Sequence, residues 1–325
     1  MGRRYLITGG AGFIGSNFIR HLFRVEPHAT VVNLDALAHA GVRTTVIELD
    51  ADRGHSFIEG DIGNALLVDG LMDGIDVVVH FAAKSNVDRS ISGPTVSIAT
   101  NVVGTGVLIE AARRHSVPRF IHVSTDEVYG SVGEGFAEED SALNPSSPYA
   151  ASKAAADLPV RSYGTTFGYM AIITRSTNNF GPYQFPEKVI PLFVTNLVRN
   201  QRVPVYGDGH NERDWLYVED HCRAIHLLVD EGVAGDIYNI GANNQMSNLD
   251  LTCRILAELA RDESMIEHVA DRPGHDDRYA VNSTKIRRLG WAPEQSFDEY
   301  LSQTVTWYQQ HRSWWGPLRG EVGVD

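Results

Sequence analysis

Two adjacent carboxylic acids, Asp126 and Glu127, follow the hydroxyl residue Thr125 at the end of an apolar run. Neighbouring carboxyls can act as acid and base in one site, because different surroundings move their pKa values apart. A threonine hydroxyl beside them can hydrogen-bond a reacting oxygen. The triplet therefore predicts a site that removes one proton and delivers another.

A second pair of residues, Tyr149 and Lys153, has the spacing that places two side chains on one face of a helix. An ammonium group near a phenol stabilises the phenolate, so we expect Lys153 to lower the pKa of Tyr149 from its usual value of about 10. Such a tyrosine can take a hydroxyl proton while hydride leaves the same carbon. Ser124 or Thr125 would complete the pair with a hydroxyl.

Hydride transfer needs a cofactor, and a glycine-rich loop near the N-terminus is typical of a dinucleotide site. Gly9 permits a tight turn, Gly12 lets the backbone approach a pyrophosphate, and Gly15 lets the following helix pack closely. That helix would point its positive end at the phosphates. Asp35 stands twenty residues after Gly15, where an acid accepts hydrogen bonds from the adenosine ribose and repels a 2′-phosphate. The pattern favours NAD over NADP.

Short apolar runs alternate with helical patterns through the first half of the chain. The runs predict strands at 5–8, 30–35, 56–61, 77–81 and 119–124, and the patterns predict helices at 14–25, 64–73, 95–115 and 148–168. Continuous apolar strands are typical of a sheet buried on both faces. Alternating β and α units predict an α/β fold with a doubly wound parallel sheet, the Rossmann fold, over residues 1–175.

Prolines and polar turns become frequent after about residue 175, although helical patterns remain near 188–200, 219–231, 248–261 and 297–311. We expect a smaller, mixed α/β domain over residues 176–325 that closes over the end of the sheet and binds the substrate. Part of the stretch 210–240 is expected to return to the first domain.

The bulk composition limits the partners of the protein. A formal net charge of −13 argues against nucleic acid and anionic membranes, which need clustered positive charge. No apolar run approaches the roughly 20 residues of a membrane span. Cys222 and Cys253 lie far apart and the histidines are scattered, so no metal site is expected. These features favour a cytoplasmic enzyme.

Several longer motifs carry a resemblance to a known family. They occupy residues 8–15, 80–83, 87–91, 124–130, 147–153, 178–188, 213–220 and 271–275. With these motifs the chain resembles the extended short-chain dehydrogenase/reductase family over essentially its whole length, and within it the dTDP-glucose 4,6-dehydratases. Those enzymes form dTDP-4-keto-6-deoxyglucose for deoxysugar biosynthesis. The resemblance also implies a homodimer joined by helices near 101–115 and 150–168.

The resemblance assigns roles to the catalytic residues. Tyr149 would take the C4 hydroxyl proton while NAD takes the C4 hydride, and Lys153 would also hold the nicotinamide ribose. Glu127 would remove the C5 proton, Asp126 would protonate the departing C6 hydroxyl, and Thr125 would hydrogen-bond the C4 oxygen. Hydride would then return to C6, leaving the cofactor unchanged.

Two sets of contacts are expected around these residues. The cofactor set is Gly9, Gly12, Phe13, Ile14, Gly15, Asp35, Asp61, Ile62, Phe81, Ala82, Ala83, Ser85, Thr100, Tyr149, Lys153 and Asn178. The substrate set is Ser85, Thr125, Asn179, Lys188, Val189, Pro204, Tyr206, Arg213, Asn248, Arg272 and His275. In these sets Lys188, Arg213 and Arg272 are the candidate partners of a diphosphate.

The chain departs from the family pattern at Lys84 and Asn86, in the loop after the fourth strand, where the family has an acid and a histidine. One alternative is therefore a dehydratase that releases a 4-keto-5,6-ene nucleotide sugar or acts on another nucleotide hexose. An alternative of another class is a non-catalytic NAD-binding scaffold. The joint presence of Thr125, the two carboxyls, Tyr149 and Lys153 counts against the scaffold.

Overall fold

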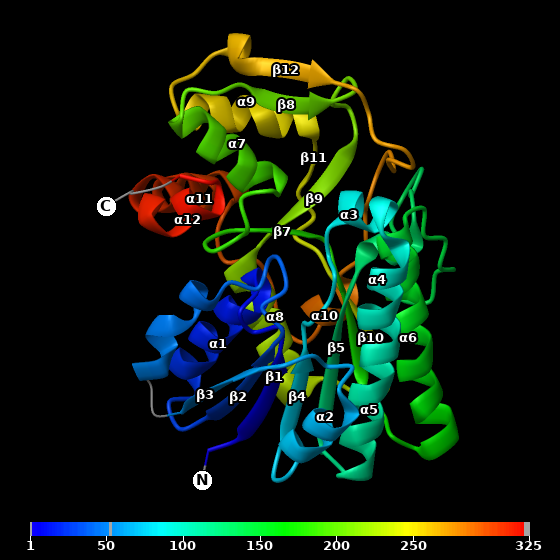
Figure 1. Ribbon diagram of the computed structural model, residues 1–325. Helices are drawn as coiled ribbons and strands as arrows, with labels where there is room; N and C mark the ends of the chain where they lie inside the picture. Colours follow the sequence, from blue (N-terminus) through cyan, green and yellow to red (C-terminus); the bar gives the residue numbers. More distant parts are fainter. Residues whose placement is uncertain (1, 52–53, 322–325) are drawn as a thin grey trace.

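A computed structural model describes residues 2–51 and 54–321 of the chain. Its centre is a seven-stranded sheet in the order β10-β6-β5-β4-β1-β2-β3 (Figure 1). Every pairing in this sheet is parallel, so all the carboxyl ends meet at one edge. The strands are β1 (Arg4–Thr8), β2 (Thr30–Asp35), β3 (His55–Glu59), β4 (Val77–His80), β5 (Arg119–Thr125), β6 (Ile172–Ser176) and β10 (Ile237–Ile240). The predicted doubly wound α/β sheet is confirmed.

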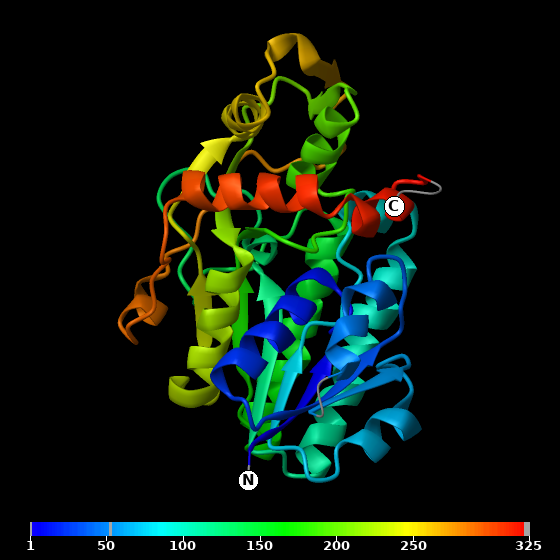
Figure 2. The same ribbon diagram turned by 90° about the vertical axis from the view of Figure 1, so that its left-hand side faces the viewer.

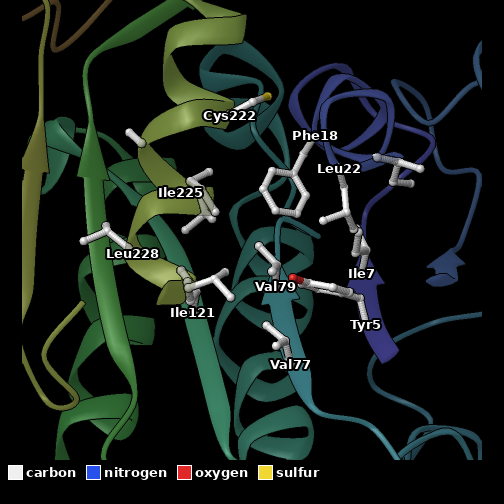
Figure 3. Close-up of a cluster of buried hydrophobic side chains, with 14 of the residues drawn as sticks. Tyr5, Ile7, Phe18, Leu22, Val77, Val79, Ile121, Cys222, Ile225 and Leu228 are labelled. Atoms are coloured by element: carbon white, nitrogen blue, oxygen red, sulfur yellow. The ribbon is translucent and has the colours of Figure 1, made fainter. Parts of the chain in front are cut away.

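Helices cover both faces of this sheet. On one face lie α1 (Phe13–Val25) and α8 (Val218–Glu231), whose Phe18, Leu22 and Ile225 pack onto β1, β4 and β5 (Figure 3). On the other face lie α2 (Ala65–Leu71), α5 (Thr105–Arg114) and α6 (Pro148–Phe167), which share a second core cluster with the sheet. Because α8 and β10 come late in the chain, the core of the sheet needs residues from both halves.

The predicted helix 95–115 contains a feature that its apolar pattern did not reveal. It runs as α4 (Pro94–Ile98), a π-helical turn (Ala99–Gly104) and α5. The stretch Pro94–Arg114 is long and apolar enough to cross a membrane by length and composition, although 44% of its most apolar window is buried in the protein. By this criterion, the expectation that no apolar run approaches the length of a membrane span is wrong for this stretch. Its contacts with α6 are those of a core helix.

A second region stands over the carboxyl edge of the sheet (Figure 2). Its strands form two small sheets, β11-β9-β7 and β12-β8. They are β7 (Asn178–Phe180), β8 (Val203–Tyr206), β9 (Glu212–Tyr217), β11 (Gln245–Ser247) and β12 (Ile266–Val269). The helices that pack on them are α7 (Val189–Val198), α9 (Asn248–Glu258), α11 (Phe297–Gln310) and α12 (Arg312–Leu318).

The remaining elements are short. They are the helices α3 (Val87–Ser92) and α10 (Thr284–Arg287) and the 3₁₀ turns η1 (Arg43–Thr45), η2 (Ile47–Ala51), η4 (Asp126–Tyr129) and η5 (Glu263–Met265). One predicted boundary is wrong in a way that matters for the site. Strand β3 ends at Glu59, so Asp61 and Ile62 lie in the turn that follows it. The division of the chain at residue 175 stays a prediction.

Candidate active site

A single cleft follows the carboxyl ends of β1, β2, β4, β5 and β6, which is where ligands bind open parallel sheets. Most of the predicted site residues line it. They are Gly9, Gly12, Phe13, Ile14, Gly15, Asp35, Asp61, Ile62, Phe81, Ala82, Ala83, Ser85, Thr100, Thr125, Asp126, Glu127, Tyr149, Lys153, Asn178, Asn179 and Lys188.

The glycine loop at one end of the cleft leaves no room for side chains. Gly9 has a φ of +74°, and a Cβ there would lie 2.6 Å from the Ala82 amide nitrogen. A Cβ on Gly15 would lie 2.4 Å from the Gly9 carbonyl oxygen. Helix α1 begins directly after Gly12, with no side-chain cap and no acid in its first turn. Its free N–H groups can therefore receive a pyrophosphate.

Two acids stand beside this loop. The Asp35 carboxylate is buried and accepts hydrogen bonds from the Ala11 amide at 2.9 Å and the Leu37 amide at 2.8 Å. Burial raises the pKa of Asp35, and these backbone bonds oppose that rise. A carboxylate has further lone pairs, so Asp35 can still accept from a ribose hydroxyl. Asp61 is exposed and accepts the Gly63 amide at 2.7 Å, which closes a turn after β3.

The triplet 125–127 sits where β5 turns into η4. Thr125 Oγ1 accepts the Glu127 amide at 3.3 Å and donates to Asp126 Oδ1 at 3.3 Å. The turn ends at Gly130, whose φ of +72° and contact with the Asn144 carbonyl oxygen exclude a side chain. The strand and this turn together aim both carboxyls into the cleft.

The two carboxyls have different surroundings. Burial and the charges of Glu127 and Asp214 raise the pKa of Asp126 well above its usual value, and Asp126 Oδ2 has no partner in the described residues. Burial also raises the pKa of Glu127, but the cations Lys188, Arg272 and Arg213 oppose that rise. Glu127 therefore loses its proton before Asp126 does. The arrangement suits a base at Glu127 and a protonated acid at Asp126.

Tyr149 and Lys153 lie in the first turns of α6, which begins after the N-cap Ser147. Lys153 Nζ donates to the Val123 carbonyl oxygen at 2.8 Å, and burial lowers its pKa to about 8. Burial and the charges of Glu127 and Asp126 raise the pKa of Tyr149. The prediction that Lys153 lowers the pKa of Tyr149 is therefore wrong in this structure. The negative charges of the two carboxyls disfavour the phenolate form of Tyr149, and the Lys153 ammonium is hydrogen-bonded to the backbone.

A buried polar cluster anchors α6 behind these two residues. Asp157 Oδ2 accepts from Arg175 Nε of β6 at 3.0 Å, and its Oδ1 lies 3.4 Å from His122 Nε2 of β5. The Arg175 guanidinium also donates to the Tyr129 hydroxyl at 2.8 Å. Asp157, Arg175 and His122 are each at most 1% exposed. The cluster therefore couples the catalytic helix to two central strands.

The structure does not place every predicted substrate residue on the cleft. Those outside its lining are Val189, Pro204, Tyr206, Arg213, Asn248, Arg272 and His275. Two Arg213 nitrogens already donate to the carbonyl oxygens of Glu212 and Asp276, at 2.7 and 2.8 Å. Arg272 Nε is buried without a partner in the described residues. The charges of Arg213 and Arg272 nevertheless act on Glu127, since both oppose the rise of its pKa.

Some lining residues were not predicted. They include Ala38, Ala40, Gly41, Ser176, Thr177, Gln184, Phe185 and Glu187. A prediction of a sixth strand would have placed Ser176 and Thr177 at the cleft, because the carboxyl ends of parallel strands meet at one edge of the sheet. Residues 184–187 carry no such signal. They reach the cleft only because the second region folds back over it.

No group of three or more His, Cys, Asp or Glu residues is placed to hold a metal ion within residues 2–51 and 54–321. The polar groups of the cleft are the free N–H groups after the glycine loop, the two carboxyls of η4 and the tyrosine–lysine pair of α6.

The fold and this cleft define a dinucleotide-dependent enzyme of the short-chain dehydrogenase/reductase type. The family model described as GDP-mannose 4,6 dehydratase matches residues 6–304. The chain belongs to that family.

Individual relatives are similar over nearly the whole chain. A dTDP-glucose 4,6-dehydratase of Streptomyces niveus is 49% identical, covering 97% of this chain and 96% of its own length. The crystal structure of DesIV, a dTDP-glucose 4,6-dehydratase from Streptomyces venezuelae with NAD bound, is 50% identical, with a TM-score of 0.95 over 97% of this chain and 99% of that one. A UDP-glucose 4-epimerase from Thermus thermophilus with NAD is 30% identical, with a TM-score of 0.87 over 94% and 99%.

Proposed function

We propose that this protein is an NAD-dependent dTDP-glucose 4,6-dehydratase, a hydro-lyase that forms dTDP-4-keto-6-deoxyglucose. The observation that carries the proposal is the acid–base pair Asp126–Glu127 in the same cleft as Tyr149 and a dinucleotide loop. An oxidoreductase acting on one hydroxyl needs only the tyrosine, whereas loss of water needs a further base and acid. The chain is 49% identical to the dehydratase of Streptomyces niveus and aligns with it over nearly the whole length of both proteins, which supports the same reaction.

The chain's own residues fit NAD. The loop 9–15 would hold the pyrophosphate, Asp35 the adenosine ribose, and Lys153 with Tyr149 the nicotinamide side. NAD, when bound, supplies a hydride acceptor for C4 of the hexose and a hydride donor for C6.

The protein groups would then handle the protons. Tyr149 takes the proton of the C4 hydroxyl while Thr125 holds the C4 oxygen. Since a ketone at C4 acidifies the C5 proton, Glu127 can remove it. Asp126, whose pKa is raised by burial, would deliver a proton to the departing C6 hydroxyl. A protonated Asp126 also removes one of the three negative charges that raise the pKa of Tyr149, those of Glu127, Asp126 and Asp157.

The diphosphate of the substrate would lie toward Lys188, Arg272 and Arg213, the three cations whose fields reach Glu127. A local positive region in a chain of net charge −13 supports this position.

We further propose a homodimer and a cytoplasmic location. Val96, Ile98 and Val103 on the stretch 94–114 and Leu158 on α6 are each more than half exposed. The helical elements that carry these residues are in contact with one another and lie at one side of the molecule (Figure 1). A second copy of the chain would bury these apolar side chains.

One incubation tests the function. Purified protein with NAD and dTDP-glucose should yield a product lighter by one water molecule with a 6-methyl proton signal. The same mass loss with a vinylic signal would indicate release of the 5,6-ene and would contradict the final reduction. Turnover of another nucleotide hexose alone would correct the substrate. No turnover of any nucleotide hexose would support the scaffold and overturn the proposal.

A further inference from the structure

The segment 183–188, called the strap here, crosses from the second region to the mouth of the cleft. Gln184, Phe185, Glu187 and Lys188 all line the cleft. Both ends of the strap are attached. The Asn17 side chain of α1 donates to the Pro182 carbonyl oxygen at 3.0 Å, and Lys188 Nζ donates to the Ser85 carbonyl oxygen at 2.9 Å.

Glu187 joins the strap to two loops of the sheet. His39 Nε2, in the loop after β2, lies 2.7 Å from Glu187 Oε2, and the His39 ring packs on Phe185 with centroids 4.9 Å apart. On the other side, Arg89 Nε lies 3.7 Å from Oε2, and the Asn86 side chain is near enough to lower the pKa of Glu187. One carboxylate therefore faces groups that follow β2 and groups that follow β4.

The order of the strands shows which loop lies beneath the bridge that Glu187 forms between the two loops. Strand β1 stands between β2 and β4, so the loop that follows β1 lies between the two loops that Glu187 joins. That middle loop is the glycine loop 9–15. The loop after β2 also rests on it, since the Val42 amide donates to the Ala11 carbonyl oxygen at 3.1 Å. The bridge consequently passes over the segment proposed to hold the pyrophosphate.

Two features of the contacts made by Glu187 indicate that they hold the strap in a closed position. Burial acts to raise the pKa of Glu187, but the Asn86 and His39 side chains bring it below its usual value, so the carboxylate is charged and its hydrogen bond with His39 is charge-assisted. His39 has a φ of +58°, in the left-handed region that is uncommon for residues other than glycine. In that conformation its side chain contacts both Glu187 and Phe185.

We propose that Glu187 is a latch: its contacts with His39, Asn86 and Arg89 keep the strap closed over bound NAD, so that the cofactor remains through many turnovers. The inference rests on the proposed function. A reaction that takes hydride from a hexose and returns it to the same hexose leaves the cofactor as it was, so exchange is unnecessary. Opening the latch should then be the slow step in the exchange of NAD.

Exchange of the dinucleotide in the absence of any sugar nucleotide tests the latch. Protein loaded with NAD is mixed with excess isotopically labelled NAD, and the rate of label uptake is measured. Glu187→Ala should exchange at least tenfold faster than the wild type. His39→Asn should also accelerate exchange, because asparagine tolerates the left-handed backbone but cannot reach the carboxylate.

Asp69→Asn is the matched control. It removes another histidine–carboxylate contact, His115 to Asp69 at 3.0 Å, at similar exposure and outside the cleft. Its exchange rate should equal that of the wild type.

The outcomes separate the two proposals. Wild-type exchange rates in both Glu187→Ala and His39→Asn overturn the latch and leave the dehydratase standing. Acceleration by Asp69→Asn equal to theirs also overturns it. A wild type that holds NAD but converts no nucleotide hexose overturns the function, while the exchange rates still decide the latch. A wild type that takes up no NAD overturns both.

Discussion

At the scale of single residues, the chemistry depends on how differently two neighbouring carboxyls are surrounded. Asp126 is 3% exposed, and two further negative groups raise its pKa, whereas three cations oppose the rise of the pKa of Glu127. Two carboxyls that are adjacent in the sequence thus lose their protons one after the other, Glu127 first. Their positions in a 3₁₀ turn, not their residue types, produce that difference.

Glu127→Gln should separate oxidation from elimination. The amide keeps the shape of the side chain but cannot take the C5 proton, so elimination should slow by about 10²–10⁴-fold while C4 oxidation continues. Reduced nicotinamide should accumulate in absorbance, and C5 should stop exchanging with deuterium from the solvent. Glu134→Gln, the same change at an exposed site, should behave as wild type. Normal elimination in Glu127→Gln would disprove the role of the base.

Asp126→Asn should change how stability depends on pH. The folded-state pKa of Asp126 lies well above its usual value of about 4, so folding takes up a proton at pH values between the two. Wild-type stability therefore falls as pH rises above about 4, and asparagine, which resembles the protonated acid, does not share that fall. With saturating NAD, the melting temperature of the variant relative to the wild type should increase progressively as pH rises above about 4. A constant difference in melting temperature would contradict the raised pKa.

At the scale of elements, α6 carries Tyr149 and Lys153, and a buried ion pair fixes it to the sheet. Asp157 and Arg175 are 0% and 1% exposed and 3.0 Å apart. Strand β5 supplies His122 to the same cluster one residue before Val123, whose carbonyl receives Lys153 Nζ. A shift of α6 would therefore move both catalytic side chains together.

Asp157→Ala should destabilise the protein strongly. Removing one partner leaves the Arg175 charge buried without its carboxylate, which costs about 3–5 kcal/mol in the free energy of unfolding. Chemical denaturation would measure it. The double variant Asp157→Leu with Arg175→Met should recover much of that loss, because it leaves no buried charge. Equal loss in both proteins would show that packing, and not charge, is what the pair supplies.

The elements were predictable to different degrees. Apolar runs located β1, β2, β4 and β5 because strands buried on both faces need such runs. The loop 9–15 and the spacing of Tyr149 and Lys153 could be recognised in the sequence because each depends only on local backbone geometry. The π-helical turn at Ala99–Gly104 was not predicted, and of the strap only Lys188 was predicted to reach the site. Both depend on contacts with distant segments, such as the bonds of Asn101 to Lys84 and Ser152. The predicted direction of the Tyr149 pKa shift was wrong for the same reason, since the shift depends on burial and on the two carboxyls of η4.

At the scale of the whole molecule, the cleft lies between the large sheet and the second region, and the proposed dimer surface lies elsewhere, on the stretch 94–114 and α6. The stretch 94–114 also carries Thr100 and Asn101 on its inner side, facing the cleft and the loop after β4. One helical layer would thus face the cofactor on one side and a second copy of the chain on the other.

Leu158→Asp should convert the proposed dimer to monomers. A charge on an apolar interface cannot be solvated there, so association weakens. Light scattering after size-exclusion chromatography would give the mass. Leu66→Asp, at a 90% exposed leucine on α2, should leave the mass unchanged. A wild type of monomer mass would refute the dimer.

The late position of α8 in the chain has a consequence for biosynthesis. Its Ile225 and Leu228 cover the same face of the sheet as Phe18 of α1 (Figure 3). While a ribosome is still translating the middle of the message, that face stays partly bare, and an apolar surface of this kind attracts chaperones and promotes aggregation. Pauses in translation before α8 has left the ribosome should therefore be harmful, and pauses after both α8 and β10 have emerged should be tolerated.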